Sequence, residues 1–356
     1  MAEYNSYNNI DFSYTKSHIK AHTGCIFKGK NYRCFYVTFP SLYRTPAEGT
    51  ETMQLYDFRP KDEIRASVII LHGLGTRNIE FLLWMGTHLA SAGVNAVVPV
   101  LPGNFTRIEN GTEFGSRYLW PDIKVIYDIY QHAVVDIRTT IDYLQQEDRW
   151  MKNNCIMGYC LGGMLLTIVS CLDDRINQKI MMTTGGNIPQ LLFESRTTRF
   201  VRRMINEGKV SDETLSDRKT LYDIYEKEWP KVKKMSLQQL LSSRDIHPLF
   251  KIDPLSYAHL LDKSKVSLID ALFDRTLSLT SRKSLYKEME GAKRYILPIS
   301  HVSWLPFEFL LARYILHKVN IYDREAASKI LIREVVQTPI EEEIIKTESQ
   351  LDDGNH

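Results

Sequence analysis

The sequence predicts an α/β protein with a mostly parallel, doubly wound sheet and an inserted helical cap. Between residues 66 and 186, short apolar runs alternate with stretches of helical periodicity. Residues 187–265 break this alternation and are charged and helix-prone, and residues 266–340 resume it. Strands that alternate with helices are typical of a parallel sheet covered on both faces. The 356 residues are enough for one such domain with an insertion.

Composition narrows the class of protein. The apolar fraction of 44% allows a sizeable core. The net charge of +2, with basic and acidic residues interspersed, does not indicate nucleic-acid binding. Five cysteines without metal-ligand spacing indicate neither a disulfide framework nor a zinc site. With the polar N-terminus, this predicts a cytoplasmic protein. We expect no metal and no cofactor, and the oligomeric state stays open.

Residues 1–65 are predicted to form an N-terminal arm and the edge of the sheet. The arm extends to about residue 22. The stretches 31–39 and 52–58 are rich in β-branched and aromatic residues and are separated by turn residues. This pattern predicts an antiparallel pair of edge strands.

The first part of the core, residues 66–186, begins with a buried strand at 67–71 that ends in His-Gly-Leu-Gly. The expected elements that follow are a helix at 79–91, a strand at 95–101, a helix from Asp122 or Lys124, the strand and helix of 154–172, and a strand at 179–184. The run from 155 to 172 carries no charge, but its glycine-rich centre favours a strand and a helix over a membrane span.

Residues 187–265 are predicted to be a cap of several helices, because the stretch contains helix-breaking prolines and enough apolar residues to exclude disorder. The second part of the core, 266–340, is expected to contain strands at 266–271 and 292–297 and helices at 281–290, 306–317 and 323–336. The tail, 341–356, is acidic and polar.

The most informative motif is Gly158-Tyr-Cys160-Leu-Gly162, a G-x-C-x-G form of the G-x-S-x-G nucleophile elbow. Such an elbow holds one exposed residue on a strained turn between a strand and a helix, and glycines allow the close backbone approach. The positive end of the helix favours a thiolate at Cys160. The alternative interpretation is a buried structural thiol.

Two downstream residues follow predicted strand ends and complete a catalytic set. His301 is the candidate base, and Asp274 is the candidate for orienting it. The order Cys, Asp, His is that of α/β-hydrolases. Asp270 competes with Asp274 but falls inside a strand, and the other histidines lie on predicted helices or in the cap (His132, His247, His259, His317).

The oxyanion hole is expected to consist of two backbone N–H groups. One belongs to Leu161, which directly follows the nucleophile, and the other to Leu74 in the loop after the first parallel strand.

These motifs resemble the α/β-hydrolase superfamily over residues 66 to 318. The cysteine elbow is similar to those of dienelactone hydrolases and polyhydroxyalkanoate synthases, whereas residues 101–107 and 133–136 are similar to esterase- or peptidase-like members that carry serine. The resemblance implies the α/β-hydrolase fold and an esterase- or thioesterase-like activity. Dienelactone hydrolases lack a cap of this size, so their substrate is not carried over.

Three functions are compatible with this pattern. The first is a hydrolase that cleaves a carboxylic ester, lactone or thioester through an acyl-cysteine intermediate. The second is an acyltransferase of the polyhydroxyalkanoate-synthase type. The third is a catalytically silent hydrolase fold that serves as a binding or interaction module. A thiolate attacks carbonyls well and is also a good leaving group, which favours activated acyl compounds. We therefore expect the first function, with a small-molecule acyl substrate as the partner.

Overall fold

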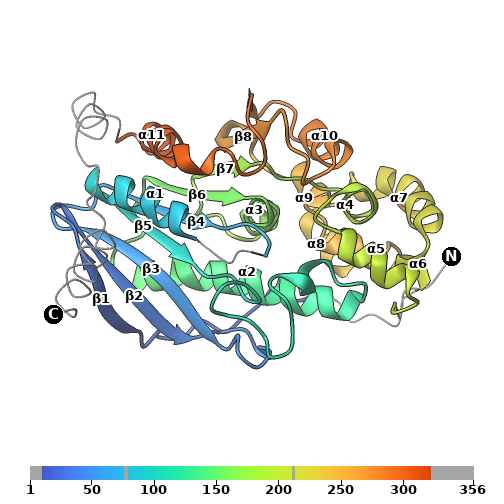
Figure 1. Ribbon diagram of the computed structural model, residues 1–356, viewed down its shortest axis with the longest axis horizontal. Coiled ribbons are helices and arrows are strands. Elements are labelled where there is room, and N and C mark those ends of the chain that lie inside the picture. Colours follow the sequence, from blue (N-terminus) through green and yellow to red (C-terminus); the bar gives the residue numbers. More distant parts are fainter. Residues whose placement is uncertain (1–9, 76–78, 211–212, 322–356) are drawn as a thin grey trace, which may run out of the picture.

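A computed structural model describes residues 10–75, 79–210 and 213–321. Nine strands form one sheet in the order β1-β2-β3-β5-β4-β6-β7-β8-β9 (Figure 1). The strands from β5 to β9 in this order pair in parallel, and those from β1 to β3 pair antiparallel, as does β3 with β5. The prediction of a mostly parallel sheet flanked by helices is therefore confirmed.

The centre of the sheet is fully buried. Every residue of four strands is buried, which is expected of parallel strands with helices on both faces: β4 (Ala66–Leu71), β5 (Val94–Pro99), β6 (Asn154–Tyr159) and β8 (Val266–Ala271). The strand β7 (Gln178–Met182) lies between β6 and β8, and β9 (Lys293–Leu297) is exposed at one edge.

The other edge is antiparallel. The strands β2 (Tyr32–Pro40) and β3 (Thr52–Pro60) pair as the sequence predicts. A further strand, β1 (His22–Lys28), lies outside β2 and was not predicted. All seven of its residues are exposed. With no buried face, β1 lacks the alternation of apolar and polar residues by which a strand is recognised in a sequence.

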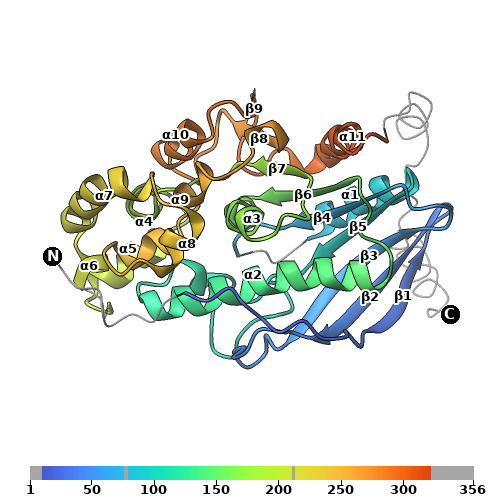
Figure 2. The same ribbon diagram turned by 180° about the vertical axis from the view of Figure 1, so that it is seen from behind.

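Helices cover both faces of the sheet (Figures 1 and 2). On one face, α1 (Glu80–Ser91) packs against α11 (Glu308–Lys318). On the other, α2 (Ile123–Gln146) packs against α3 (Leu161–Leu172). The α2 helix begins where the sequence predicts, because the Asp122 carboxylate accepts hydrogen bonds from the backbone N–H groups of Lys124 and Val125.

Between β7 and β8 the chain forms short helices that gather at the right of Figure 1. They are α4 (Ile188–Glu194), α5 (Arg199–Asn206), α6 (Glu213–Ser216), α7 (Arg218–Val232), α8 (Leu237–Ser242) and α9 (Pro254–Ala258), with 3-10 turns at η2 (Pro248–Lys251) and η3 (Lys263–Lys265). The helical content agrees with the predicted cap, while the domain boundaries themselves stay a prediction. The remaining elements are α10 (Leu279–Glu288), η1 (Ser116–Leu119) and η4 (Leu305–Phe307).

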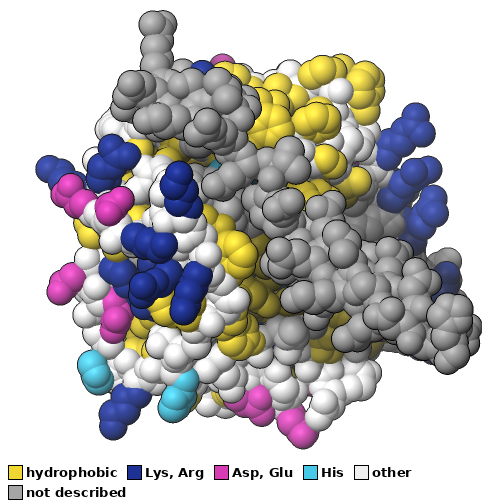
Figure 3. Space-filling view, turned by 60° about the vertical axis from the view of Figure 1, so that its left-hand side comes forward, with side chains coloured by type: hydrophobic (Ala, Val, Ile, Leu, Met, Phe, Trp, Pro, Cys, Tyr) yellow, Lys and Arg dark blue, Asp and Glu magenta, His cyan; other side chains and the backbone are white. Residues whose placement is uncertain are grey.

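The surface carries both basic and apolar groups. Figure 3 shows a face on which Lys and Arg side chains gather beside exposed hydrophobic side chains. Within the described ranges, no helix has the length and apolar character needed to cross a bilayer. The helix predicted at 323–336 and the tail at 341–356 lie outside the described residues.

Two glycines allow α3 to pack directly on the strand that precedes it. A Cβ at Gly158 would lie 2.3 Å from the carbonyl oxygen of Gly162, and a Cβ at Gly162 would lie 2.5 Å from the carbonyl oxygen of Leu71. Both contacts involve backbone atoms that cannot rotate away. The crossing of β4, β6 and α3 therefore depends on glycine at these positions.

We accordingly expect Gly158→Ala to destabilise the fold severely. Relieving the contact requires α3 to move away from β6, which places the cost at or above the upper end of the range of about 1 to 3 kcal/mol that is typical of overpacking. Urea unfolding followed by circular dichroism measures the loss. Gly24→Ala is the control, because no atom lies within 4 Å of the added Cβ and the backbone of Gly24 does not have a positive φ. Equal unfolding midpoints for the two variants would contradict the expectation.

Candidate active site

Cys160 occupies the turn between β6 and α3 in a conformation that side chains rarely adopt, with φ of 53° and ψ of −113°. Its backbone is held on both sides: the N–H donates to the Met182 carbonyl at 3.0 Å, and the carbonyl accepts from the Thr184 hydroxyl at 3.0 Å. A strained backbone conformation persists only where surrounding contacts hold the residue in place, and such residues cluster at functional sites.

The sequence-based expectation that Cys160 is exposed is wrong. The residue is only 6% exposed. It lies in a cavity, where Thr197 from the loop between α4 and α5, and Leu74 from the loop after β4, also line the wall. Segments remote in sequence thus cover the turn, and the turn motif alone carries no information about them.

His301 and Asp274 lie together, as the sequence predicts. The Nδ1 of His301 donates a hydrogen bond to Oδ2 of Asp274 at 2.7 Å. The other carboxylate oxygen accepts the backbone N–H groups of Thr276 at 2.8 Å and Leu277 at 3.2 Å. Burial alone would raise the pKa of Asp274, but the His301 hydrogen bond and charge and the backbone donors outweigh it and lower the pKa. Asp274 is therefore an ionised carboxylate that accepts the His301 hydrogen bond.

The loop that carries His301 is anchored by two aromatic side chains. The hydroxyl of Tyr159 and the indole N–H of Trp304 both donate to the His301 carbonyl, at 3.0 and 3.1 Å. The Tyr159 ring also packs against both the imidazole and the indole, with centroid distances of 5.1 Å each. Because Tyr159 directly precedes Cys160, this contact couples the position of the imidazole to that of the sulfur.

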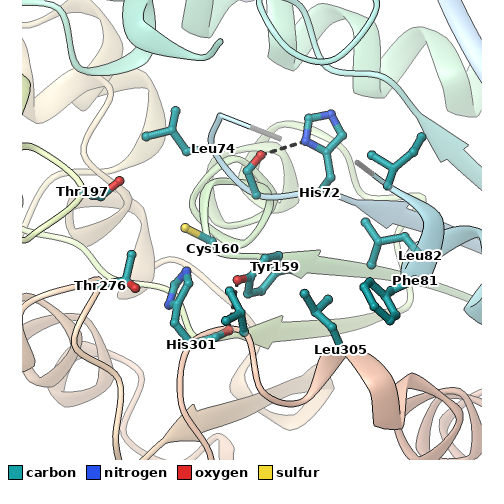
Figure 4. A pocket seen from close by; sticks show the side chains of 13 residues that line it. His72, Leu74, Phe81, Leu82, Tyr159, Cys160, Thr197, Thr276, His301 and Leu305 are labelled. Carbon is teal, nitrogen blue, oxygen red and sulfur yellow. Dashed lines mark hydrogen bonds between the residues drawn. The ribbon is translucent and has the colours of Figure 1, made fainter. Parts of the chain in front are cut away.

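The imidazole of His301 faces the Cys160 sulfur (Figure 4). Burial would lower the pKa of His301, but the interaction with Cys160 and the hydrogen bond to Asp274 outweigh burial and raise the pKa to about 10. The imidazole is therefore protonated at neutral pH. An imidazolium beside the sulfur stabilises negative charge there by Coulomb attraction.

This pKa predicts a measurable pH dependence. The folded-state pKa of His301 lies above its ordinary value of 6.5, so the charged imidazole stabilises the fold fully below about pH 6.5. That stabilisation is lost as the pH rises through about 10. We expect the imidazole nitrogens of His301 to titrate near pH 10 in the native protein by ¹⁵N NMR. In Cys160→Ser, which lacks the sulfur, the midpoint should fall towards the ordinary value, because Cys160 is one of the contributions that raise the pKa of His301; an unchanged midpoint would contradict that contribution.

The two residues predicted to supply the oxyanion donors both lie near Cys160: Leu161 follows it directly, and Leu74 lines the same cavity. Leu161 is the first residue of α3, and its N–H has no acceptor among the described residues; the same holds for the N–H of Leu74. The Gly162 N–H donates to the carbonyl oxygen of His72 at 3.1 Å, which ties the helix start to the loop of Leu74. Both N–H groups are therefore free to receive a ligand oxygen.

His72 stabilises this loop through hydrogen bonds of both ring nitrogens. Its Nε2 accepts the Leu101 N–H at 2.9 Å, which assigns the proton to Nδ1, and Nδ1 donates to the Gly73 carbonyl at 2.8 Å (Figure 4). Burial lowers the pKa of His72 to about 4, so the ring is neutral. In the sequence, the only signal for this role of His72 is its position in the His-Gly-Leu-Gly loop.

The competing residues have other partners. Asp270 forms ion pairs with Arg282 and with Arg294, the latter at 3.1 Å, so it holds β8 rather than His301. His132, His247, His259 and His317 are not among the residues that line the cavity. In the part of the chain that the structure describes, no group of three or more His, Cys, Asp and Glu side chains is arranged to hold a metal ion.

The cavity has a volume of about 280 Å³. Besides Cys160, His301, Tyr159 and the His72–Gly73 turn, its lining is mostly apolar: Leu74, Ile79, Phe81, Leu82, Val302 and Leu305. Two threonines that were not predicted, Thr197 and Thr276, complete the lining. Thr276 could have been found from its place two residues after Asp274, whereas nothing in the sequence marks Thr197.

Comparison with known proteins identifies the architecture. No protein-family model and no curated protein sequence matches the chain. Among solved structures, acetyl xylan esterases from a Paenibacillus species and a Thermoanaerobacterium species are similar, each with 15% identity and TM-scores of 0.52 and 0.53. The alignments cover 89% and 86% of this chain and 91% and 89% of those chains.

The acylaminoacyl peptidase of Pyrococcus horikoshii is also similar, with 16% identity and a TM-score of 0.53 over 83% of this chain and 43% of that one. At these identities the similarity concerns the fold. Together with the strand order, the turn at Cys160 and the positions of Asp274 and His301 after β8 and β9, it assigns the chain the α/β-hydrolase fold.

Proposed function

We propose that this protein is a hydrolase that cleaves a carboxylic ester, lactone or thioester through an acyl-cysteine intermediate. The proposal rests on one observation above all: the strained Cys160 and the Asp274-bound His301 meet in a cavity with two free backbone N–H groups. Nucleophile, base, orienting carboxylate and oxyanion donors are the four parts that acyl transfer requires.

In the first half of the proposed reaction, the Cys160 sulfur attacks the carbonyl carbon of the substrate. A carbon–sulfur bond forms, and the carbonyl electron pair moves to oxygen, where the N–H groups of Leu161 and Leu74 donate hydrogen bonds. When the intermediate collapses, the bond to the leaving group breaks. The leaving group takes the proton from Nε2 of His301, whose positive charge has until then been balanced by Asp274 and the sulfur.

In the second half, water enters on the side that the leaving group has vacated. Nε2 of His301 removes a proton from the water as its oxygen attacks the acyl carbon. The same oxyanion donors stabilise the second intermediate. Its collapse releases the acid and returns Cys160 as a thiolate beside an imidazolium, which restores the resting ion pair.

Acyl-enzyme capture tests this proposal. The protein is mixed with p-nitrophenyl acetate, quenched in acid within milliseconds to seconds, and analysed by mass spectrometry after proteolysis. We expect one acetyl group on the peptide that contains Cys160, together with a burst of p-nitrophenolate. Continued turnover by Cys160→Ala, or acetyl groups spread over other residues, would reject the acyl-cysteine mechanism.

The two alternative functions give different results in related assays. An acyltransferase would release coenzyme A from a hydroxyacyl thioester and form polymer or transferred product instead of free acid. A silent binding module would leave Cys160 unreactive towards iodoacetamide at neutral pH. The charged His301 beside the sulfur favours a reactive Cys160 and therefore speaks against the silent module.

A further inference from the structure

The loop after β4 contains two successive peptide groups that decide where the Leu74 N–H points. The group between Gly73 and Leu74 includes that N–H, and the next group, between Leu74 and Gly75, includes the Gly75 N–H. A peptide group is planar and trans, so its C=O and N–H point in opposite directions, and a hydrogen bond at one end orients the other end. The direction of the Leu74 N–H therefore depends on what holds these two groups.

The first group is held by His72. The Nδ1 of His72 donates to the Gly73 carbonyl oxygen at 2.8 Å (Figure 4). The Leu74 N–H, at the other end of the same group, therefore points away from the His72 ring. One hydrogen bond leaves the group free to turn about its own axis, so a second contact is needed to fix the direction of the N–H.

The second group is held by the side chain of Asn104. Its Oδ1 accepts the Gly75 N–H at 2.9 Å, and its Nδ2 donates to the Pro102 carbonyl oxygen at 3.1 Å. These partners assign the oxygen and the nitrogen of the side-chain amide, because an N–H requires an acceptor and a carbonyl requires a donor. Asn104 thus fixes the peptide group that directly follows Leu74.

Asn104 can reach the site only through this loop. Its side chain is fully buried, and it is not among the residues that line the cavity. Its surroundings are tightly packed: a Cβ on Gly115 would lie 2.6 Å from the Gly75 nitrogen and 3.0 Å from Oδ1 of Asn104. The missing side chain at Gly115 thus provides the space in which Asn104 and Gly75 meet.

A short turn holds Asn104 in place. The N–H of Arg107 donates to the Asn104 carbonyl oxygen at 2.8 Å, and the N–H of Gly103 donates to the Arg107 carbonyl oxygen at 2.7 Å. The N–H of Gly115 in turn donates to the Gly103 carbonyl oxygen at 2.6 Å. These hydrogen bonds fix the backbone from which the Asn104 side chain extends.

A buried guanidinium joins this turn to the core. Arg107 is fully buried and donates to the carbonyl oxygens of Val100 at 2.7 Å and Thr50 at 2.6 Å. It also pairs with Asp136 of α2 at 2.8 Å. Burial would raise the pKa of Asp136, but the charges of His132 and Arg107 outweigh burial and lower it, so the carboxylate is ionised. Because separating a buried ion pair is costly, the turn has little freedom to move.

We infer that Asn104 is a positioning residue for the oxyanion hole: by holding the Gly75 N–H, it keeps the Leu74 N–H directed at the oxygen of the tetrahedral intermediate. With His72 on one peptide group and Asn104 on the next, neither group can turn without breaking a buried hydrogen bond. This inference rests on the proposed acyl-cysteine function and adds to it a residue that lies outside the cavity.

Loss of the Asn104 side chain should slow acylation of Cys160 and leave substrate binding nearly unchanged. Oxyanion donors act on charge that develops in the transition state, and loss of a whole donor costs about a hundredfold to a thousandfold. A misdirected donor should cost less. We expect the rate constant of acylation by p-nitrophenyl acetate to fall about tenfold to a hundredfold in Asn104→Ala. The ester concentration that gives half of the maximal acylation rate should change less than about threefold.

Two further variants keep the test independent of how well Asn104→Ala folds. In Asn104→Thr the side chain is one bond shorter and does not reach the Gly75 N–H, so it should show the same loss. Asn104→Asp retains an oxygen for this N–H and gives up the donor to Pro102. It should keep the rate constant of acylation within about fivefold of the native value.

Two reagents that modify Cys160 separate the direction of the donor from general damage to the site. With 1,1,1-trifluoro-2-butanone, the sulfur adds reversibly to the carbonyl carbon: a carbon–sulfur bond forms, and the carbonyl electron pair moves to the oxygen, which the oxyanion donors stabilise. Iodoacetamide alkylates the same sulfur with loss of iodide and creates no oxyanion. In Asn104→Ala the ketone should bind about tenfold to a hundredfold more weakly, whereas the rate constant of alkylation should change less than about twofold.

Asn154→Ala is the matched control. Asn154 is buried, and its side chain also bonds only to backbone: it accepts the Asn177 N–H at 2.7 Å and donates to the Met151 and Arg175 carbonyl oxygens at 2.9 and 3.1 Å. It is the first residue of β6, at the end of the strand opposite to Cys160. This variant should lose stability, as Asn104→Ala does, without a change in acylation or in ketone binding.

The outcomes separate this inference from the proposed function. Native ketone binding in Asn104→Ala, or an equal loss in Asn154→Ala, would overturn the positioning role and leave acyl-cysteine chemistry intact. A parallel loss of alkylation by iodoacetamide in Asn104→Ala would also overturn it, because damage to Cys160 and His301 would then explain the kinetics. If Cys160 of the native protein takes up neither the acetyl group nor the ketone, the proposed function fails, and this inference fails with it.

Discussion

Cys160→Ala should reduce kcat/KM on an activated ester or thioester by at least about a thousandfold. The variant retains the cavity, the oxyanion donors and the His301–Asp274 pair, but no atom remains that can form the acyl intermediate. Removing a nucleophile from a catalytic set of this kind typically costs several orders of magnitude, and the residual rate comes from the oxyanion donors and substrate binding. Initial rates with p-nitrophenyl acetate and butyryl-coenzyme A measure the loss.

The chain provides a matched control for this variant. Cys171 lies near the end of α3, where its thiol contacts the carbonyls of Thr167 and Tyr257 away from the cavity. Cys171→Ala should retain activity, and both variants should give native circular dichroism spectra. Comparable activity in Cys160→Ala and the native protein would show that the strained turn has a structural role only.

Asp274→Asn should lower kcat by about a thousandfold to ten thousandfold, with a much smaller change in KM. Asp274 accepts the proton on Nδ1 of His301 at 2.7 Å and is almost fully buried with it. An amide in its place can offer its NH₂ group to Nδ1, which selects the wrong tautomer and removes the negative charge that stabilises the imidazolium. Steady-state kinetics from pH 5 to pH 10 resolve the effect.

The pH profile separates a catalytic role from a structural one. Loss of the carboxylate should lower the pKa of His301, because the hydrogen bond to Asp274 is one of the contributions that raise it. The limb of the profile that reports His301 should therefore shift to lower pH. Asp245→Asn, which removes an exposed carboxylate that pairs with Lys231 at 3.4 Å, should alter neither kcat nor the profile. A loss of stability without a shift of the pH profile would contradict the assigned role.

The helices and strands of the core were predictable because the spacing of apolar residues in the sequence reflects which of their side chains are buried. The strand predicted at 266–271 has these bounds in the structure, and α2 begins at Ile123, between the two predicted starts at Asp122 and Lys124. The strand β1 was not predicted because none of its side chains is buried. Its backbone pairs with β2, but this pairing does not require apolar and polar residues to alternate along the strand. Local sequence thus predicts a helix or strand only where the element has one buried face and one exposed face.

Some features of the candidate site could also be predicted from local sequence, whereas others could not. Gly158, Cys160 and Gly162 identify the turn together with the apolar strand before them and the helix after them, since a strand that enters a helix over so short a distance requires glycine and places one residue at its apex. The positions of Asp274 and His301 follow from the rule that strand ends share one edge of a parallel sheet. Their hydrogen bond is the geometry that this rule leads one to expect.

What the sequence by itself determined is the fold, the turn at Cys160 and the residues that the sheet brings to it, because these follow from periodicity and from the steric requirements of single positions. Only the tertiary structure decided that Cys160 is covered, that Tyr159 anchors the His301 loop, and that Thr197 and Thr276 line the cavity. These contacts join segments that are remote in sequence and depend on how the loop between α4 and α5 packs on the loop after β8, which no local pattern of residues encodes.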